Sequence, residues 1–235
     1  MSPVAQRLEA VRDRIATAAQ RSGRDPKEVK LIAVSKRQSA EAIRELVDLG
    51  VQDFAESQIQ EAQQKTAVFS NLPLNWHFVG HLQSNKTRHI AGQFACIHSI
   101  DSLKLIRRIA ESTIDLEQPV RLLLQVNIAD DPNKHGMQRE EVLPLIDTVL
   151  SEAPKGVKLC GLMTIGFRDA DETDVRRGFS DLRDLLEICQ NRFGKTLCEL
   201  SMGMSGDYVT AVEEGATMVR VGNILFGERG RSTTF

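Results

Sequence analysis

Eight short apolar runs, separated by longer amphipathic segments, extend along almost the whole of this chain. Each run is rich in β-branched and aliphatic residues, whereas the intervening segments repeat their apolar residues at helical spacing. The runs cover 29–35, 51–54, 76–79, 95–100, 120–128, 157–164, 197–201 and 217–221. Strands that alternate regularly with helices predict parallel βαβ units.

Eight units of this kind predict a closed (β/α)₈ barrel, because five or six would instead indicate an open, doubly wound sheet. No G-x-G-x-x-G motif follows the first run and no Walker loop is present, which weakens the open nucleotide-binding alternative. The length of 235 residues is close to the roughly 250 typical of such a barrel. We therefore expect a single α/β domain over 1–235, a (β/α)₈ barrel of the TIM type with an extra N-terminal helix at about 3–22.

Helical periodicity fills the gaps between the runs. An apolar stripe that begins at Val4 and ends at Ile15 precedes the first strand. A second helix over 40–49 ends at Gly50, a typical C-terminal glycine. The remaining predicted helices cover 57–69, 84–91, 103–114, 139–150, 175–192 and 206–214.

Composition and charge exclude several kinds of partner. A net charge of -2 shows no basic excess that would attract nucleic acid or anionic lipid. No apolar stretch approaches the ~20 residues needed to cross a bilayer, and the N-terminal segment lacks the apolar core of a signal peptide. We expect a cytoplasmic protein that binds neither nucleic acid nor membrane.

The cysteines and histidines form no recognisable disulfide or metal-binding pattern. No C-x-x-C pair is present, and Cys96 and Cys160 lie in apolar runs that are typical of the core. The histidines likewise lack the tight spacing of a helix-borne metal pair. We therefore expect neither a disulfide nor a metal site. The residues concerned are Cys96, Cys160, Cys189, Cys198, His77, His81, His89, His98 and His135.

Lys36 directly follows the first apolar run. Chemistry in a (β/α)₈ barrel is located at the C-terminal ends of the strands, so this side chain would point into the mouth of the pocket. Partial desolvation there favours the neutral amine that reacts with an aldehyde. A surface lysine just past a strand end is the competing interpretation, and position alone favours it.

Two small, glycine-containing loops predict a phosphate site. Residues 201–206 connect the seventh run to a helix for which Ser205 is a suitable N-cap, and Gly222 and Asn223 follow the eighth run. Barrels often bind phosphate in the loops after strands seven and eight, where backbone N–H groups point at the anion. A pair of ordinary capped turns is an equal alternative.

Arg220 lies near the end of the apolar run T-M-V-R-V. A buried guanidinium requires a partner, and a heteroatom of a ligand in the pocket is one candidate. A structural salt bridge is the alternative.

Six segments taken together resemble one known family. They are L-I-A-V-S-K, W-H-F-V-G-H-L-Q-S-N-K, L-Q-V-N-I, G-L-M-T-I-G, L-S-M-G-M-S-G-D and M-V-R-V-G-N-I-L-F-G. In order and spacing, from about Val29 to Gly227, they resemble the YggS/PROSC family of pyridoxal phosphate homeostasis proteins. The resemblance implies a barrel like the N-terminal domain of alanine racemase, with pyridoxal 5′-phosphate (PLP) as the cofactor.

The resemblance also implies a role for each site residue. Lys36 matches the family lysine that holds PLP as a Schiff base, and Arg220 matches the arginine that faces the pyridine nitrogen. Because an arginine keeps its proton, it leaves that nitrogen unprotonated and the ring a weak electron sink. Met163 lies at a strand end that lines the same pocket. The residues that fall where the family wraps the phosphate are Ser201, Ser205, Gly206, Gly222 and Asn223.

Three positions of the expected site depart from the family pattern. Ser57 stands where the family commonly has an asparagine near the cofactor, and its shorter side chain would reach PLP through water. His81 replaces a proline, and Asn223 replaces a threonine or serine in the phosphate loop. These changes bear on cofactor affinity and leave Lys36 in place. By the same resemblance, Lys134 is a candidate for a second PLP site.

The function that the resemblance implies is that of a non-catalytic carrier, which takes part in PLP homeostasis and delivers PLP to apo-enzymes as a monomer. The alternative is an amino-acid racemase of weak or narrow activity. In alanine racemase the second base is a tyrosine of a C-terminal domain, whereas the one tyrosine here, Tyr208, lies in the predicted phosphate-side helix. A Schiff-base aldolase or a sugar-phosphate isomerase would use Lys36 on a substrate, although aldolases generally carry their lysine on a later strand.

Overall fold

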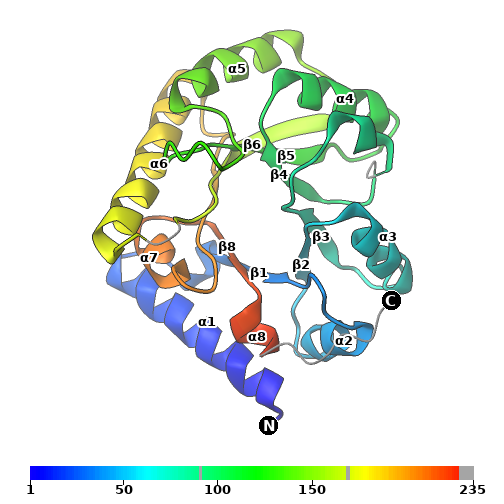
Figure 1. Cartoon of the computed structure of the whole chain (residues 1–235), viewed down its shortest axis with the longest axis vertical. Helices are drawn as coiled ribbons and strands as arrows, with labels where there is room; N and C mark the ends of the chain where they lie inside the picture. The colour runs from blue at the N-terminus through cyan, green and yellow to red at the C-terminus, as the bar shows by residue number, and fades with distance from the viewer. Residues whose placement is uncertain (90–91, 168–169, 228–235) are drawn as a thin grey trace.

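The computed structural model describes residues 1–89, 92–167 and 170–227. Within these residues, eight parallel strands close into one barrel in sequence order, and β1 pairs with β8 to complete it (Figure 1). The strands are β1 (Lys30–Val34), β2 (Asp53–Glu56), β3 (Asn75–Phe78), β4 (Cys96–Ile100), β5 (Val120–Gln125), β6 (Val157–Met163), β7 (Glu199–Ser201) and β8 (Met218–Val221). Each strand overlaps its predicted run, so the predicted fold class is confirmed.

Helices surround the ring of strands, as Figure 1 shows. They are α1 (Pro3–Arg21), α2 (Ala40–Asp48), α3 (Ile59–Val68), α4 (Leu103–Thr113), α5 (Arg139–Glu152), α6 (Glu172–Phe193), α7 (Tyr208–Glu213) and α8 (Asn223–Phe226), with 3₁₀ helices η1 (Pro26–Glu28) and η2 (Ser84–His89). In the described part of the chain, none of them combines the length and the apolar character needed to cross a bilayer.

The connection between β3 and β4 differs from the prediction. The helix predicted over 84–91 is the 3₁₀ helix η2, and residues 90 and 91 lie outside the described residues. Its sequence, S-N-K-T-R-H, presents no apolar side chain, and Thr87 is its buried residue among the side chains described. Without an apolar stripe, a longer α-helix gains nothing from packing on the barrel.

The phosphate-side helix also begins later than predicted. The helix predicted over 206–214 is α7, which starts at Tyr208 and has Asp207 as its N-cap residue. The predicted N-cap, Ser205, is therefore wrong, because its hydroxyl accepts a hydrogen bond from the Gly222 N–H instead. The short helix α8 directly after β8 was not predicted.

Helix α1 packs against α7 and α8, the helices on either side of β8 in the sequence. Ser2 caps its N-terminus through a hydrogen bond from the Ala5 N–H, and its apolar stripe is buried. In Figure 1 it runs alongside α7 and α8. Arg7 donates hydrogen bonds to the carbonyl oxygens of Leu225 and Phe226, at 2.8 and 3.1 Å. The first helix thus fixes the position of the loop and helix that follow β8.

The buried apolar residues form two clusters. The larger one lies between the strands and the helices. The smaller one consists only of strand residues from around the ring, so it fills the barrel interior. Its members are Ile32, Ala55, Cys96, Leu123, Cys160, Met163 and Met218. Several polar residues are buried as deeply as this inner cluster.

Candidate functional site

Lys36 stands on a tight turn at the C-terminal end of β1. The Gln38 N–H donates to the Ser35 carbonyl oxygen at 3.0 Å, and Arg37 has a left-handed backbone with φ 60°. Ser35 is fully buried, whereas Lys36 is exposed at the barrel mouth. The partial desolvation expected for the Lys36 amine is therefore not observed.

A buried ion-pair network supports this turn from β2 and α3. Lys65 Nζ donates to the Ser35 carbonyl oxygen at 2.6 Å and to carboxylate oxygens of Glu56 and Glu61, both at 2.7 Å. Glu61 also accepts the N–H of Arg37. The backbone on both sides of Lys36 is thus held by Lys65 and Glu61, two side chains that were not predicted to belong to the site.

Glu56 is the least satisfied member of this network. Burial raises the pKa of its carboxyl group, and the charge and hydrogen bond of Lys65 offset that effect only in part. Ser35 Oγ donates to Glu56 Oε1 at 2.6 Å, while among the described residues Oε2 has no hydrogen-bond partner.

A cavity of about 190 Å³ lies beside the turn. Its lining includes Lys36, Ser57, Gly222 and Asn223. The structure therefore brings these four predicted site residues together, from the ends of β1, β2 and β8. The backbone after β8 approaches β1 closely because Gly222 has no side chain. A Cβ atom there would lie only 3.2 Å from the Val34 carbonyl oxygen.

The two predicted phosphate loops are joined directly. The Gly222 N–H donates to Ser205 Oγ at 3.3 Å, which links the loop after β8 to the loop after β7. In the loop after β7, Asp207 Oδ1 accepts the Met204 N–H at 2.6 Å. Gly206 of the same loop is exposed. Hydroxyl and backbone N–H groups thus converge at this edge of the barrel mouth.

Arg220 is buried near the C-terminal end of β8 and is not part of the lining of the Lys36 cavity. Its Nη1 donates to Ser201 Oγ at 2.7 Å and its Nη2 to the Thr164 carbonyl oxygen at 2.8 Å. Burial lowers the pKa of Arg220 to about 10, against an opposing influence from the Asp207 carboxylate. The salt-bridge alternative is not observed among the described residues, since both recorded acceptors are neutral.

Two other predicted site residues lie deep in the barrel. Met163 belongs to the inner apolar cluster and is fully buried. Ser201 is also fully buried, and its hydroxyl contacts Arg220 and His98. The phosphate contact expected for Ser201 stays a prediction, made for a hydroxyl that already has two partners.

Lys134 and His81 are not part of the lining of the Lys36 cavity. Lys134 Nζ donates to the Gly166 carbonyl oxygen at 3.0 Å and lies 3.6 Å from Asp131. His81 stacks on His135, with ring centroids 4.0 Å apart. Lys134 is therefore engaged with the loop after β6, and its role as a second PLP site stays a prediction.

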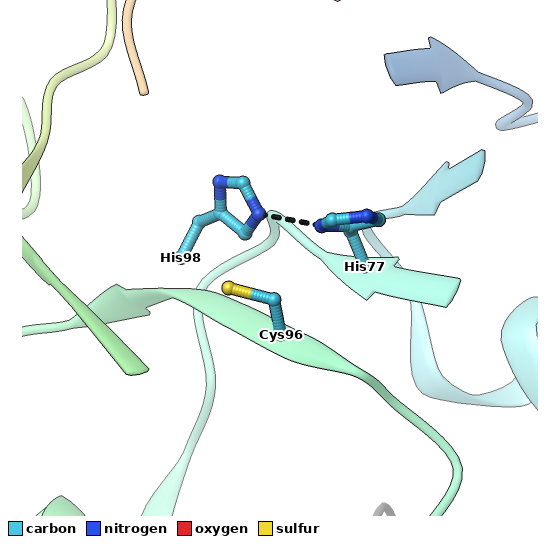
Figure 2. A group of neighbouring side chains, drawn as sticks. All are labelled: His77, Cys96 and His98. Carbon is cyan, nitrogen blue, oxygen red and sulfur yellow. Dashed lines mark hydrogen bonds between the residues drawn. The ribbon is translucent and has the colours of Figure 1, made fainter. Parts of the chain in front are cut away.

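Two histidines that are distant in the sequence and lack the spacing of a helix-borne metal pair are in contact. His77 on β3 and His98 on β4 place ring nitrogens 2.9 Å apart, with Cys96 close by (Figure 2). Residue spacing along the chain did not indicate this contact, because adjacent parallel strands bring distant residues together. The inward position of each residue on its strand was the one available signal.

The chain matches the family model of the alanine racemase N-terminal domain over residues 6–230. A pyridoxal phosphate homeostasis protein of Pseudomonas aeruginosa is 43% identical over 229 residues, 97% of each chain. One of Escherichia coli (strain K12) is 39% identical over 238 residues, 99% of each chain.

Solved structures agree with this match. PipY of Synechococcus elongatus, determined with PLP bound, superposes with a TM-score of 0.82 at 36% identity and covers 95% of this chain and 100% of its own. An alanine racemase of Clostridium difficile shares the fold at 15% identity, with a TM-score of 0.71 over 95% of this chain and 61% of its own.

Proposed function

This chain belongs to the alanine racemase N-terminal domain family, among the pyridoxal phosphate homeostasis proteins, and on that basis we propose that it carries PLP on Lys36. The family expected from the sequence is thereby confirmed. The proposed role is that of a non-catalytic carrier, which takes up PLP and delivers it to apo-enzymes.

The observation that carries this proposal is the cavity that Lys36 shares with Ser57, Gly222 and Asn223. A phosphorylated aldehyde requires a primary amine for its carbonyl carbon and hydrogen-bond donors for its phosphate. The β1 turn supplies the amine, and the joined loops after β7 and β8 supply hydroxyl and backbone N–H groups. The residues present therefore fit the cofactor that the relatives are named for.

When bound, PLP supplies an aldehyde that forms a Schiff base with one amine and can exchange it for another. The exposure of Lys36 keeps its amine accessible to an incoming ligand. The Lys65 and Glu61 hydrogen bonds fix the turn from which that amine extends. Lys36 would bind PLP. Its phosphate would be held by Ser205, Gly206, Gly222 and Asn223. The pocket would be completed by Ser57, Met163 and Ser201.

Arg220 limits what a bound cofactor does. Its pKa of about 10 leaves it protonated at neutral pH, so its nitrogens offer only N–H donors. If Arg220 faces the ring nitrogen of PLP, as the family resemblance implies, that nitrogen would stay unprotonated and carbanions would be poorly stabilised. This favours a carrier over a racemase or a transaminase.

Tyr208 also favours the carrier. Racemisation requires a second base on the opposite face of the substrate carbon. The single tyrosine of the chain lies in α7 and is 3% exposed. It packs closely on Gly203: a Cβ atom added to Gly203 would lie 2.9 Å from the Tyr208 Cα. We place the carrier in the cytoplasm and treat 1–235 as one PLP-binding domain that acts as a monomer.

The test is the visible absorption spectrum of the purified protein with added PLP. Wild type should develop a yellow Schiff-base band that borohydride reduces, and Lys36→Ala should not. Lys104→Ala, which replaces an exposed lysine outside the Lys36 cavity, is the matched control and should retain the full band. Mass mapping after reduction should place the label on Lys36, and the absence of label on Lys134 would refute the predicted second site.

A band that survives in Lys36→Ala would refute the Lys36 linkage. Delivery is measured by mixing the loaded protein with an apo-enzyme and following recovery of that enzyme's activity. Alanine racemisation by the same sample, abolished in Lys36→Ala, would favour the racemase instead.

A further inference from the structure

Five polar residues form a continuous hydrogen-bonded chain through the barrel interior. Asp53 Oδ1 lies 3.0 Å from His77 Nε2, and His77 Nδ1 lies 2.9 Å from His98 Nε2. His98 Nδ1 lies 2.8 Å from Ser201 Oγ, which accepts from Arg220 at 2.7 Å. The five residues come from β2, β3, β4, β7 and β8. All of them except Asp53 are at most 4% exposed.

The donors and acceptors of this chain can be arranged in only one direction. The Asp53 carboxylate has acceptors only, so a neutral His77 donates its Nε2–H to Asp53 and accepts the Nε2–H of a neutral His98 at Nδ1. His98 Nδ1 is then an acceptor, so Ser201 Oγ donates its hydrogen to His98 and accepts from Arg220. Every hydrogen points from Arg220 toward Asp53, and each ring nitrogen is satisfied.

Burial is consistent with this arrangement, because it keeps both rings neutral. It lowers the pKa of His98 well below 6.5, and positive neighbours add to the effect. It also lowers the pKa of His77, against the opposing influence of Asp53. For Asp53, the hydrogen bond from His77 and the charge of Lys30 outweigh burial, so its pKa lies below the ordinary value and it is ionised.

The chain connects the two ends of the barrel. Asp53 is the first residue of β2 and pairs with Lys30, the first residue of β1, at 3.3 Å. Both residues line a cavity of about 490 Å³ at the N-terminal ends of these strands. Arg220 lies near the C-terminal end of β8, on the side of the predicted cofactor site.

Cys96 makes a metal ion the competing occupant of this region. Its Sγ and one nitrogen each of His77 and His98 lie within 4.8 Å of one another, and Figure 2 shows the three side chains converging. Burial strongly raises the pKa of the Cys96 thiol, however, so a dication would first have to displace its proton. The nitrogens that would bind the ion already hydrogen-bond to each other. These observations favour the chain.

We propose that His77 and His98 are positioning residues, which orient the Arg220 guanidinium on the side of the predicted cofactor site and couple it to the Asp53 carboxylate at the other end of the barrel. Ser201 is the link that Arg220 contacts directly. Hydrogen bonds in such a series polarise one another, so the Asp53 charge makes Ser201 Oγ a better acceptor for Arg220. The effect on PLP rests on the proposed function, whereas the chain itself does not.

The chain is tested first without cofactor. ¹⁵N-resolved NMR of the imidazole groups in the apoprotein should show His77 and His98 as neutral, Nε2-protonated tautomers with slowly exchanging protons. Asp53→Asn should speed the exchange of both Nε2 protons. Glu199→Gln is the matched control, because Glu199 is similarly exposed (19% against 15%), is the first residue of β7 as Asp53 is of β2, and pairs with Arg121, but lies outside the chain.

The coupling to Arg220 is tested in the PLP-loaded protein. His98→Ala should shift the absorption maximum of the bound cofactor and release PLP about tenfold faster. Asp53→Asn, which keeps the side-chain shape, should shift the same band and release PLP about threefold faster. Glu199→Gln should match wild type in both. Unfolding of every variant is measured in parallel, because loss of stability alone would leave the band of the folded fraction unchanged.

The two arms separate the possible failures. If the tautomers are as expected but wild type shows no PLP band, the proposed function is refuted and the hydrogen-bonded chain is sustained. The coupling between Asp53 and Arg220 would then be measured from the change in the Arg220 N–H signals of Asp53→Asn. An Nδ1-protonated or charged His98 would overturn the proposal. So would Zn²⁺ alone, added to the apoprotein, if it shifted both imidazole signals in wild type and not in Cys96→Ser.

Discussion

The Nζ of Lys65 lies 2.6 Å from the carbonyl oxygen of Ser35, the residue directly before Lys36. A fully buried lysine on α3 therefore holds the turn after β1 that presents the exposed Lys36. The same ammonium group neutralises Glu56, whose side chain is equally buried.

Replacing Lys65 should destabilise the fold severely. Lys65→Met leaves Glu56 buried without its counter-ion, and breaking a buried pair in this way costs about 3–5 kcal/mol. Urea-induced unfolding measures the change. Arg108→Met, which breaks the exposed pair with Glu111, is the control and should cost less than about 1 kcal/mol. Equal losses in the two variants would contradict the role given to Lys65.

The buried histidines should make the fold sensitive to acid. His77 and His98 are neutral in the fold but titrate near 6.5 when unfolded, because their pKa values are lowered only in the folded state. Below pH 6.5 the unfolded chain binds more protons, so their contribution is complete above that pH. It is lost as the pH falls, by up to about 1.4 kcal/mol per pH unit for each histidine.

The free energy of unfolding measured between pH 7.5 and pH 5 checks this. His98→Gln should lose the share of the slope that belongs to one histidine, whatever its stability at neutral pH. Parallel curves for wild type and His98→Gln would show that His98 is not held neutral.

Gly203 should tolerate no side chain. Its φ is 88°, and an added Cβ would lie 2.5 Å from the Ala211 Cβ and 2.9 Å from the Tyr208 Cα. Gly203→Ala should cost about 1–2 kcal/mol for the left-handed backbone and a further 1–3 kcal/mol for overpacking. Gly206→Ala in the same loop meets nothing within 4 Å and should change the thermal midpoint little. A similar midpoint for both variants would refute this account of the loop.

Restoring the family asparagine at position 57 should strengthen PLP binding. Ser57 lines the Lys36 cavity, and a longer amide could replace a water-mediated contact with a direct hydrogen bond. A gain of about 0.5–1.5 kcal/mol corresponds to roughly 2- to 10-fold slower release of PLP from Ser57→Asn. Gln58→Asn alters the same cavity lining without this contact and should leave the release rate unchanged. Faster release from Ser57→Asn would argue against Ser57 as a cofactor contact.

The strands were predictable because a parallel barrel buries both faces of each strand, which leaves continuous apolar runs in the sequence. The amphipathic helices were predictable for the same kind of reason, and the helix predicted over 84–91 proved to be the short 3₁₀ helix η2, whose polar sequence has no apolar stripe. Lys36, Gly222 and Asn223 could be selected from their positions at strand ends, and they do share one cavity.

The supporting residues could not be predicted from one sequence. Lys65 stands in a polar helical segment that looks like an ordinary solvated face, and only the tertiary structure buries it against Glu56. His77 and His98 meet because β3 and β4 are neighbours, a relationship that residue spacing does not express. Ser205 appeared to be a helix cap because its partner, the Gly222 N–H, comes from a different strand end.

The pairing of β1 with β8 has a consequence for the life of the chain during synthesis. Lys36 is made before the loop that completes its cavity, because that loop follows β8. A nascent chain that lacks β8 therefore offers a bare amine and no complete pocket. If PLP binds Lys36 and the loop after β8 as proposed, it would link β1 and β8, and occupancy should slow the opening of the barrel between these strands.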